Sequence, residues 1–145
     1  LATSARLAIK SSIFSRKQLQ LLSDLAKRVT QEKETEKPYS QNYTKFIKVN
    51  SEYYMCTVCG QKLFENNSKF DSHCGWPAFD SAIEGSITLI EDNTHGMQRT
   101  EAVCSKCNAH LGHLFLNEKG PNTQRYCINA VAIGYLENGQ MIRFE

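Results

Sequence analysis

The motif Cys56-Thr-Val-Cys59 recurs in the same form as Cys104-Ser-Lys-Cys107, and the two hold four of the six cysteines of the chain. Each motif places two thiolates on one tight turn, which Gly60 eases in the first of them. Two such turns supply the four sulfur ligands of a tetrahedral zinc ion, with no position left for water. The sequence therefore predicts a structural zinc site made of these four cysteines.

Other interpretations of the cysteines remain open at the level of sequence. His110 stands three residues after Cys107 and could replace one cysteine as a ligand. A dithiol of the thioredoxin kind would need a strand before the motif and a helix after it, and no helical pattern follows either motif. Six cysteines could also form three disulfides in a secreted domain, but a chain of 145 residues can bury a core without them.

The charges of the chain are distributed unevenly. Residues 1–23 contain four basic and no acidic residues, whereas residues 24–145 contain 13 basic and 15 acidic residues. The second part therefore lacks the basic surface of a nucleic-acid-binding protein, and no stretch of ~20 apolar residues predicts a membrane span. We expect one monomeric domain over residues 24–145 after a basic extension at 1–23.

The extension is rich in Ser, Arg and Lys, like the end of a mitochondrial transit peptide. A plain N-terminal extension fits the same residues. The composition slightly favours a mitochondrial over a cytoplasmic location.

The hydrophobic pattern predicts one helix followed mainly by strands. Leucines spaced by three predict a helix over residues 17–29, and Gln31 to Pro38 is interpreted as a linker or wrapping arm. Asn138-Gly139 predicts a tight hairpin turn into Met141–Phe144. The expected fold is a mainly antiparallel β domain with a short helical N-terminus. Strand patterns occur at Phe46-Ile47, Tyr53-Tyr54, Leu63-Phe64, Ser86–Ile90, Met97–Val103 and Arg125–Leu136.

The two remaining cysteines are candidates for redox chemistry. In an extended strand Arg125, Cys127 and Asn129 project to one face, and a nearby arginine favours a thiolate. Cys74 lies in a turn-rich loop, where a thiol can move to meet an oxidised partner. The alternative is that both are small buried residues without a chemical role, as free cysteines often are.

His110, His113 and Trp76 are further candidates for a site. The histidines lie on opposite faces if their segment is extended, and they converge if Gly112 makes a turn. A converged pair could position water or a proton donor; otherwise one is a zinc ligand and one a surface residue. Trp76 is either a core aromatic or the wall of a site for a methyl or thioether group.

Four motifs occur in a specific order: Cys-Gly-Trp-Pro-Ala-Phe at 74–79, His-Gly-Met-Gln-Arg at 95–99, Cys-x-x-Cys-x-Ala-His-Leu-Gly-His at 104–113, and Arg-Tyr-Cys-Ile-Asn at 125–129. In this order they resemble the methionine-R-sulfoxide reductases of the B type. The resemblance runs from about residue 29 to residue 133. It implies a β-tent fold of two antiparallel sheets, with zinc distal to the active site.

The resemblance also implies a role for each candidate. Cys127 matches the nucleophile that attacks the sulfoxide sulfur of oxidised methionine and becomes a sulfenic acid. Cys74 matches the resolving cysteine, which forms a disulfide with Cys127 that thioredoxin reduces. Trp76 matches the aromatic residue that packs on the substrate methyl. The polar residues that match those around the sulfoxide oxygen and the nucleophile are His110, His113, Arg125 and Asn129.

The chain departs from the family pattern at several positions. His73 stands where a glycine is usual before the Cys-Gly-Trp-Pro motif, and Asn117 stands where an aspartate is often found. Ala78 and Ala130 replace serines. Asn117 puts one active-site carboxylate in doubt, and His73 could alter how the Cys74 loop moves.

Two other functions compete with the reductase that the resemblance implies. A zinc-ribbon-like binding module would leave Cys74 and Cys127 inert. A cysteine hydrolase would use Cys127 with His110 or His113, and its activity would not depend on Cys74 or on a reductant.

Overall fold

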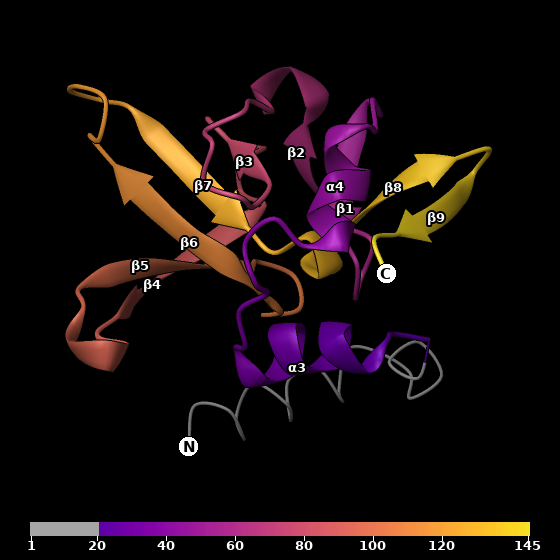
Figure 1. The fold of residues 1–145 in the computed structure, drawn as a ribbon, viewed down its shortest axis with the longest axis horizontal. Helices are drawn as coiled ribbons and strands as arrows, with labels where there is room; N and C mark the ends of the chain where they lie inside the picture. Colours follow the sequence, from indigo (N-terminus) through magenta and orange to yellow (C-terminus); the bar gives the residue numbers. More distant parts are fainter. Residues whose placement is uncertain (1–20) are drawn as a thin grey trace.

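The computed structural model describes residues 21–145 and places them in two antiparallel sheets with two helices beside them (Figure 1). The mainly β fold with two antiparallel sheets is therefore confirmed. One sheet has the order β2-β1-β8-β9, with bounds Tyr53–Cys56 (β1), Lys62–Glu65 (β2), Ile133–Glu137 (β8) and Gln140–Arg143 (β9). The other has the order β3-β7-β6-β5-β4, with bounds Ala78–Phe79 (β3), Ile87–Asp92 (β4), Arg99–Cys104 (β5), His110–Leu116 (β6) and Gln124–Ile128 (β7).

Short 3-10 turns complete the described elements: Asn66–Ser68 (η1), Thr94–Gly96 (η2) and Ala130–Ala132 (η3). Within residues 21–145, none of the helices has the length and apolar character needed to cross a membrane.

Helix α3 spans Asp24–Glu32 and corrects the prediction of a helix over residues 17–29. Residues 17–20 of that prediction lie outside the described residues, but residues 21–23 are not helical. The helix begins where it does because the Ser23 hydroxyl accepts a hydrogen bond from the Ala26 amide (3.1 Å) and so caps its N-terminus. The segment from residue 33 to residue 40, here called the arm, connects α3 to the second helix.

Helix α4, Gln41–Ile47, shows that the strand predicted at Phe46-Ile47 was wrong. Ser40 caps this helix by accepting a hydrogen bond from the Tyr43 amide (3.1 Å). Tyr43 and Phe46 are three residues apart, and both are buried on one side of the helix. A seven-residue helix with two buried aromatic residues is too short to show a clear helical period in the sequence.

The segment predicted as one strand, Arg125–Leu136, is divided between the two sheets. Strand β7 ends at Ile128, the 3-10 turn η3 follows, and β8 begins at Ile133 in the other sheet. Asn129 therefore lies just beyond β7 rather than on its face. The Asn138-Gly139 hairpin between β8 and β9 is confirmed, with both residues at positive φ.

Buried aromatic rings join the two sheets and α4 into one core. Phe64 of β2 stacks on Phe79 of β3 with ring centroids 4.1 Å apart. Phe46 of α4 contacts Phe79 and Tyr54 at centroid distances of 5.7 and 5.3 Å. Phe144, near the C-terminus, packs on Phe46 at 5.7 Å. This core holds β3 and β7, and with them the candidate site, in a fixed position relative to the first sheet.

Candidate functional site

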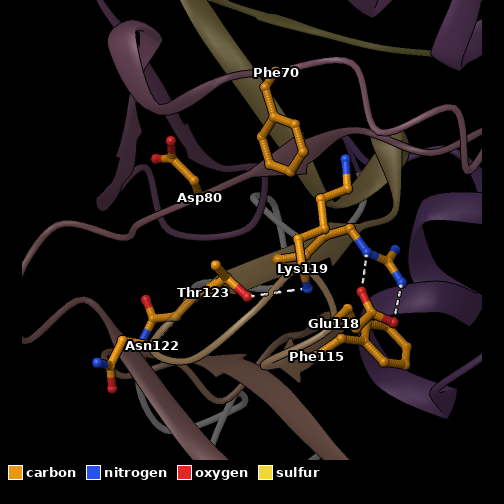
Figure 2. A pocket seen from close by; sticks show the side chains of 9 residues that line it. Phe70, Asp80, Phe115, Glu118, Lys119, Asn122 and Thr123 are labelled. Atoms are coloured by element: carbon orange, nitrogen blue, oxygen red, sulfur yellow. Dashed lines mark hydrogen bonds and ion pairs between the residues drawn. The ribbon is translucent and has the colours of Figure 1, made fainter.

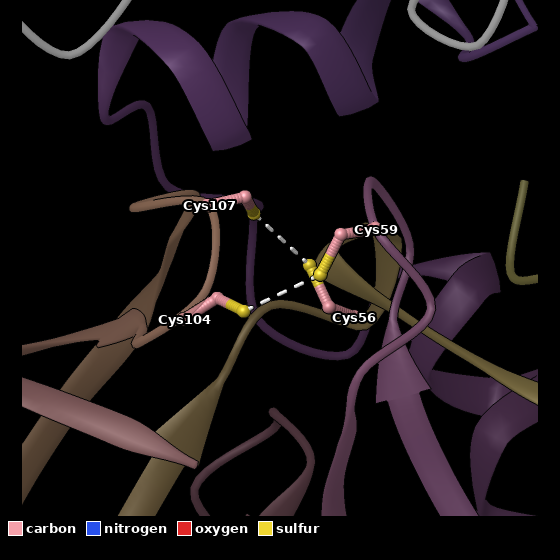
Figure 3. A group of neighbouring side chains, drawn as sticks. All are labelled: Cys56, Cys59, Cys104 and Cys107. Atoms are coloured by element: carbon pink, nitrogen blue, oxygen red, sulfur yellow. Dashed lines mark hydrogen bonds between the residues drawn. The ribbon is translucent and has the colours of Figure 1, made fainter. Parts of the chain in front are cut away.

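The four cysteines of the two short motifs lie together and point toward one another (Figure 3). Cys56 ends β1 and Cys104 ends β5, so the two sheets meet at this cluster. The Sγ distances are 3.6 Å for Cys56–Cys107 and for Cys59–Cys104, and all four sulfurs lie within 4.8 Å of one another. A tetrahedral ion with metal–sulfur bonds of about 2.3 Å needs sulfurs about 3.8 Å apart. The cluster is therefore positioned to bind a metal ion.

Cys74 and Cys127 form a second sulfur pair. Cys127 is on β7 and pairs with Ala78 of β3, while Cys74 lies in the loop before β3. Their Sγ atoms are 3.7 Å apart, and both side chains are half-buried. A disulfide has sulfurs about 2.05 Å apart, so the thiols need to approach by less than two ångströms to form one.

The two thiols share a hydrogen bond that separates their pKa values. The bond with Cys127 lowers the pKa of Cys74 to about 5. Burial opposes this shift, and the hydrogen bond from the Ser72 hydroxyl and the contact with the Trp76 backbone support it. The same bond, together with burial, raises the pKa of Cys127 even though Arg125 lowers it. The shared hydrogen bond therefore favours the thiolate form of Cys74. Arg125, which made Cys127 a candidate thiolate in the sequence, does act to lower its pKa.

Replacing Cys74 by Ala should lower the pKa of Cys127, because the neighbour that raises it most is removed and Arg125 remains. The pH dependence of Cys127 alkylation measures this pKa, with the four cysteines of the cluster protected by bound metal. Ser81→Ala, an exposed hydroxyl outside the pair, serves as the control. A Cys127 pKa that stays unchanged or rises in the Cys74→Ala protein would contradict the account.

A bulge in β6 places His110 and His113 on the same face. Val103 of β5 pairs with His110 and Ala102 pairs with Gly112, so one step on β5 matches two steps on β6. The extra residue brings together side chains that a regular strand would place on opposite faces. The two rings lie 5.6 Å apart. The sequence had considered a regular strand or a turn, and a bulged strand is what the chain adopts.

Each histidine is bound to a buried carboxylate that sequence reasoning missed. His110 Nδ1 lies 2.6 Å from Glu101 Oε2, and His113 Nε2 lies 2.8 Å from Asp92 Oδ2. Because a carboxylate only accepts, each of these ring nitrogens donates, which fixes the tautomer of a neutral ring. His110 is thus held by Glu101, and the metal-binding group in the described part of the chain consists of the four cysteines alone.

Two cations balance the two buried carboxylates. Lys33, the first residue of the arm, places Nζ 3.1 Å from Asp92 Oδ2 and 3.4 Å from Glu101 Oε1. Arg99 Nη2 lies 3.5 Å from Asp92 Oδ2. Both carboxylate side chains are at most 2% exposed. Since buried charges require partners, the arm is part of the site rather than a linker.

The pKa values of Asp92 and His113 follow from this arrangement. Burial acts to raise the pKa of Asp92, but hydrogen bonds from His113, Thr94 and Lys33 lower it well below its usual range. Burial lowers the pKa of His113, and the bond to Asp92 offsets this only in part, while Arg99 lowers it further. His113 is therefore a neutral imidazole at neutral pH.

Replacing Lys33 by Met should raise the pKa of His113. Asp92 and Glu101 would then carry one negative charge without a cation to balance it, and this charge favours the imidazolium form of His113. The His113 imidazole resonances, titrated by NMR, report this pKa directly. Lys37→Met removes the same charge from an exposed position of the arm and should leave it unchanged. A His113 pKa that is unchanged or lower in the Lys33→Met protein would refute this role of Lys33.

Three hydrogen bonds fasten the arm to the Cys74 loop. The Tyr39 amide donates to the Gly75 carbonyl (2.8 Å), and the Tyr39 hydroxyl donates to the His73 carbonyl (2.8 Å). Trp76 Nε1 donates to the Glu36 carbonyl (2.9 Å). The arm thereby fixes the position of Trp76 and of the loop that carries Cys74.

The arm also fixes Asn129, beyond the end of β7. The Glu36 amide donates to Asn129 Oδ1 (2.9 Å), and Asn129 Nδ2 donates to the Leu111 carbonyl (2.9 Å). The Glu36 carboxylate accepts a hydrogen bond from the Val131 amide (2.7 Å). Both Glu36 and Asn129 are buried, so their polar atoms depend on these partners. Asn129 is thus a residue that supports the end of β7.

His73, the departure from the usual glycine, has φ +60° in the left-handed region. A residue with a side chain is less favourable there than glycine by about 1 kcal/mol. His73→Gly should therefore raise the free energy of unfolding by about 0.5–1 kcal/mol. His95 has φ +59°, so His95→Gly should also raise the free energy of unfolding. Lys48 has φ −88°, so Lys48→Gly should lower it. Denaturant unfolding of the three variants measures this, and a loss of stability in His73→Gly would contradict it.

A small cavity of about 100 Å³ opens beside Cys127. Trp76, His113, Cys127 and Asn129 are the predicted site residues that line it. The sequence analysis assigned no role in a site to the other lining residues, which come from the arm and from β5, β6 and β7: Thr35, Arg99, Gly112, Phe115 and Ile128.

Arg125 lies on the same face of β7 as Cys127 but is held by other partners. Its guanidinium makes two hydrogen bonds to the Glu118 carboxylate (2.8 and 3.1 Å) and lies 4.4 Å from the centroid of the Phe115 ring. Asn117, where an aspartate was expected, instead accepts a hydrogen bond from the Asn122 amide (2.9 Å) within the hairpin loop. The carboxylate nearest Arg125 in this loop is therefore Glu118.

Comparison with known proteins places the chain in a family. Residues 22–137 match the model of the SelR domain. The chain is 45% identical over 113 residues to a protein of Bradyrhizobium diazoefficiens named peptide methionine sulfoxide reductase MsrB, covering 77% of this chain and 80% of that protein. Proteins of the same name are 47% identical in Pseudomonas syringae pv. syringae (70% of this chain, 76% of the relative) and 44% identical in Methanosarcina mazei (74% and 76%). The chain therefore belongs to the SelR domain family, together with these curated MsrB proteins.

Proposed function

We propose that this chain reduces the R epimer of methionine sulfoxide in proteins, with Cys127 as nucleophile, Cys74 as resolving cysteine and thioredoxin as reductant. Membership of the SelR family makes it a methionine sulfoxide reductase, as its relatives are named. The observation that carries the finer proposal is the Cys74–Cys127 pair, with sulfurs 3.7 Å apart at a cavity lined by Trp76 and His113. Each sulfoxide epimer requires its own enzyme.

The first step oxidises Cys127. Its thiol passes a proton to the Cys74 thiolate, and the resulting Cys127 thiolate attacks the sulfoxide sulfur. This attack forms a bond between the two sulfurs, and the sulfoxide oxygen takes up a proton from solvent. The hydroxyl group then moves to the Cys127 sulfur as the bond between the two sulfurs and the substrate sulfur–oxygen bond break. Cys127 becomes a sulfenic acid, and the substrate sulfur keeps the electron pair and leaves as the thioether of methionine. The neutral His113 offers a ring nitrogen that can accept a hydrogen bond from the new hydroxyl group.

The second step forms the disulfide. Cys74 attacks the sulfenic sulfur of Cys127, and its proton leaves with the hydroxyl group as water. The thiol that received the proton in the first step thus supplies it in the second. Thioredoxin then reduces the Cys74–Cys127 disulfide by thiol–disulfide exchange and restores both thiols. The approach of less than two ångströms that this requires is small for a loop.

The cavity suits the end of a methionine side chain. At about 100 Å³ it has room for one thioether and its sulfoxide oxygen. We assign Trp76 to the apolar wall beside the substrate methyl group, and Arg125 and Asn129 to the polar surroundings of Cys127. His110 is fully buried, so its role is to support His113.

We propose zinc as the ion of the four-cysteine cluster. Four thiolates at tetrahedral spacing suit zinc and leave no open position, so the ion would be structural and would tie β1 to β5. The reaction described above needs no metal, and every group in it belongs to the chain or to its substrates.

The function is tested by incubating the enzyme with separate R and S epimers of an oxidised methionine peptide, with thioredoxin, thioredoxin reductase and NADPH. We expect turnover of the R epimer alone. Replacing thioredoxin by dithiothreitol should preserve this stereochemistry, which separates the substrate proposal from the reductant proposal. Turnover of the S epimer, or of neither epimer by zinc-loaded protein, would overturn the proposal.

A further inference from the structure

A groove of about 500 Å³ lies at the β6–β7 hairpin (Figure 2). Phe115 lines both, and Arg125 of the groove is two residues from Cys127 on the same face of β7. The groove and the active-site cavity are therefore neighbours on this face of the sheet. Its lining consists of two residues that flank the Cys74 loop and seven from the β6–β7 hairpin: Phe70, Asp80, Phe115, Glu118, Lys119, Asn122, Thr123, Gln124 and Arg125.

The groove exists because β3 is much shorter than its neighbour. The β3–β7 ladder consists of the pairs Ala78–Cys127 and Phe79–Tyr126, and β3 ends there. Strand β7 begins at Gln124, so in the described part of the chain no strand pairs with its first two residues on the β3 side. Asp80 turns away, since its amide donates to the Ser68 carbonyl (2.9 Å).

The walls of the groove combine apolar and polar groups. Phe70 enters from one side and Phe115 from the other, and both rings are half-buried (Figure 2). Phe115 is covered on one side by Arg125, which Glu118 holds in place. The Lys119 amide donates to the Thr123 hydroxyl (3.3 Å), so the hairpin loop is fastened internally. The groove is therefore preformed.

We propose that this groove binds the polypeptide that flanks the oxidised methionine, a proposal that rests on the proposed function. The flanking segment lies extended along the open edge of β7, with an apolar side chain between Phe70 and Phe115. An unpaired strand edge beside apolar pockets is a common way to bind an extended peptide. Free methionine sulfoxide has no flanking residues to reach the groove, so contacts with Phe70 and Phe115 are gained only by a peptide substrate.

The proposal is tested with three substrates carrying the R sulfoxide: free methionine sulfoxide, a pentapeptide with glycines around the oxidised methionine, and one with leucines there. We expect the wild-type enzyme to have a lower KM for the leucine peptide than for the glycine peptide. Phe70→Ala should raise the KM for the leucine peptide about tenfold, because half of the contact area of one apolar side chain is lost. Its kcat, and its kcat/KM for free methionine sulfoxide, should not change.

Tyr53→Ala is the matched control. Tyr53 is also a half-buried aromatic residue, but it lies on β1 in the other sheet, in a separate hollow. This variant should have the same KM and kcat as the wild type for all three substrates. Equal losses on all substrates in Phe70→Ala, or no loss on the leucine peptide, would overturn the groove assignment. Turnover of none of the substrates by the wild-type enzyme would instead overturn the proposed function on which it rests.

A second measurement does not depend on how well Phe70→Ala folds. The leucine peptide is titrated into Cys127→Ser protein, which cannot react, and amide shifts are followed by NMR. We expect the peptide to shift the amides of Phe70, Thr123 and Gln124, whereas free methionine sulfoxide shifts those near His113 only. Groove amides that remain unmoved at saturating peptide would refute the proposal.

Discussion

Cys127→Ser should abolish reduction of methionine sulfoxide, with a fall in kcat of about 10⁴-fold or more, as expected when a covalent enzyme loses its nucleophile. A serine hydroxyl remains protonated at neutral pH and cannot become a sulfenic acid. Because Cys127 is half-buried and pairs with Ala78 and His113 through its backbone, the substitution should leave the fold intact. Initial rates with dithiothreitol and with thioredoxin measure the effect.

Cys74→Ser is the matched control for this prediction. It should lose thioredoxin-dependent turnover and still release one methionine per chain in a single turnover, because the nucleophile remains. Residual steady-state turnover in Cys127→Ser would show that another group attacks the sulfoxide. Full multiple turnover by Cys74→Ser with thioredoxin would show that Cys74 does not resolve the sulfenic acid.

Removal of the metal, or Cys56→Ser, should unfold the domain rather than only slow the enzyme. A structural zinc site contributes about 10 kcal/mol or more, which is comparable with the whole stability of about 5–15 kcal/mol of a domain of this size. The cluster joins the ends of β1 and β5, and thus the two sheets. Far-ultraviolet circular dichroism and bound-zinc analysis measure the outcome.

Cys74→Ser again provides the comparison, because it removes a thiol outside the cluster and should keep both zinc and fold. Adding zinc back to the chelated wild type should restore its spectrum, and adding it to Cys56→Ser should not. A metal-free protein with a native spectrum and normal activity would contradict a structural role for the cluster.

Local patterns in the sequence were sufficient for much of the fold. The two short cysteine motifs predict the cluster because four ligands with fixed spacing have few other uses, and Asn138-Gly139 predicts its hairpin because both residues tolerate positive φ. The predictions that were wrong concern features that depend on tertiary contacts. Helix α4 is too short to show a period, and the break after Ile128 depends on which sheet each half joins.

The candidate site was predictable only where its residues lie within motifs. The bulge that brings His110 and His113 together depends on the pairing of β6 with β5, which one sequence does not reveal. Asp92 and Glu101 lie 21 and 9 residues from their histidines, and Lys33 comes from a segment that looked like a linker. Such contacts have no local signature, although a buried histidine pair could have prompted a search for carboxylates.

The departure from the family pattern at Asn117 has a structural setting that the sequence did not reveal. The missing aspartate suggested a lost active-site carboxylate, but Asn117 has φ +60°, a conformation that asparagine tolerates well. The neighbouring Glu118 makes the two-bond contact with Arg125. The carboxylate of this loop that contacts Arg125 is therefore that of Glu118.

The central claim is that Cys127 and Cys74 carry the redox chemistry while the other four cysteines hold the metal. The most direct test is a single turnover without reductant: the zinc-loaded enzyme reacts with a slight excess of R sulfoxide and is digested, and its disulfides are mapped by mass spectrometry. We expect one methionine released per chain, one Cys74–Cys127 disulfide and retained zinc. A disulfide within the cluster, or methionine released while Cys74 and Cys127 both remain thiols, would contradict the claim.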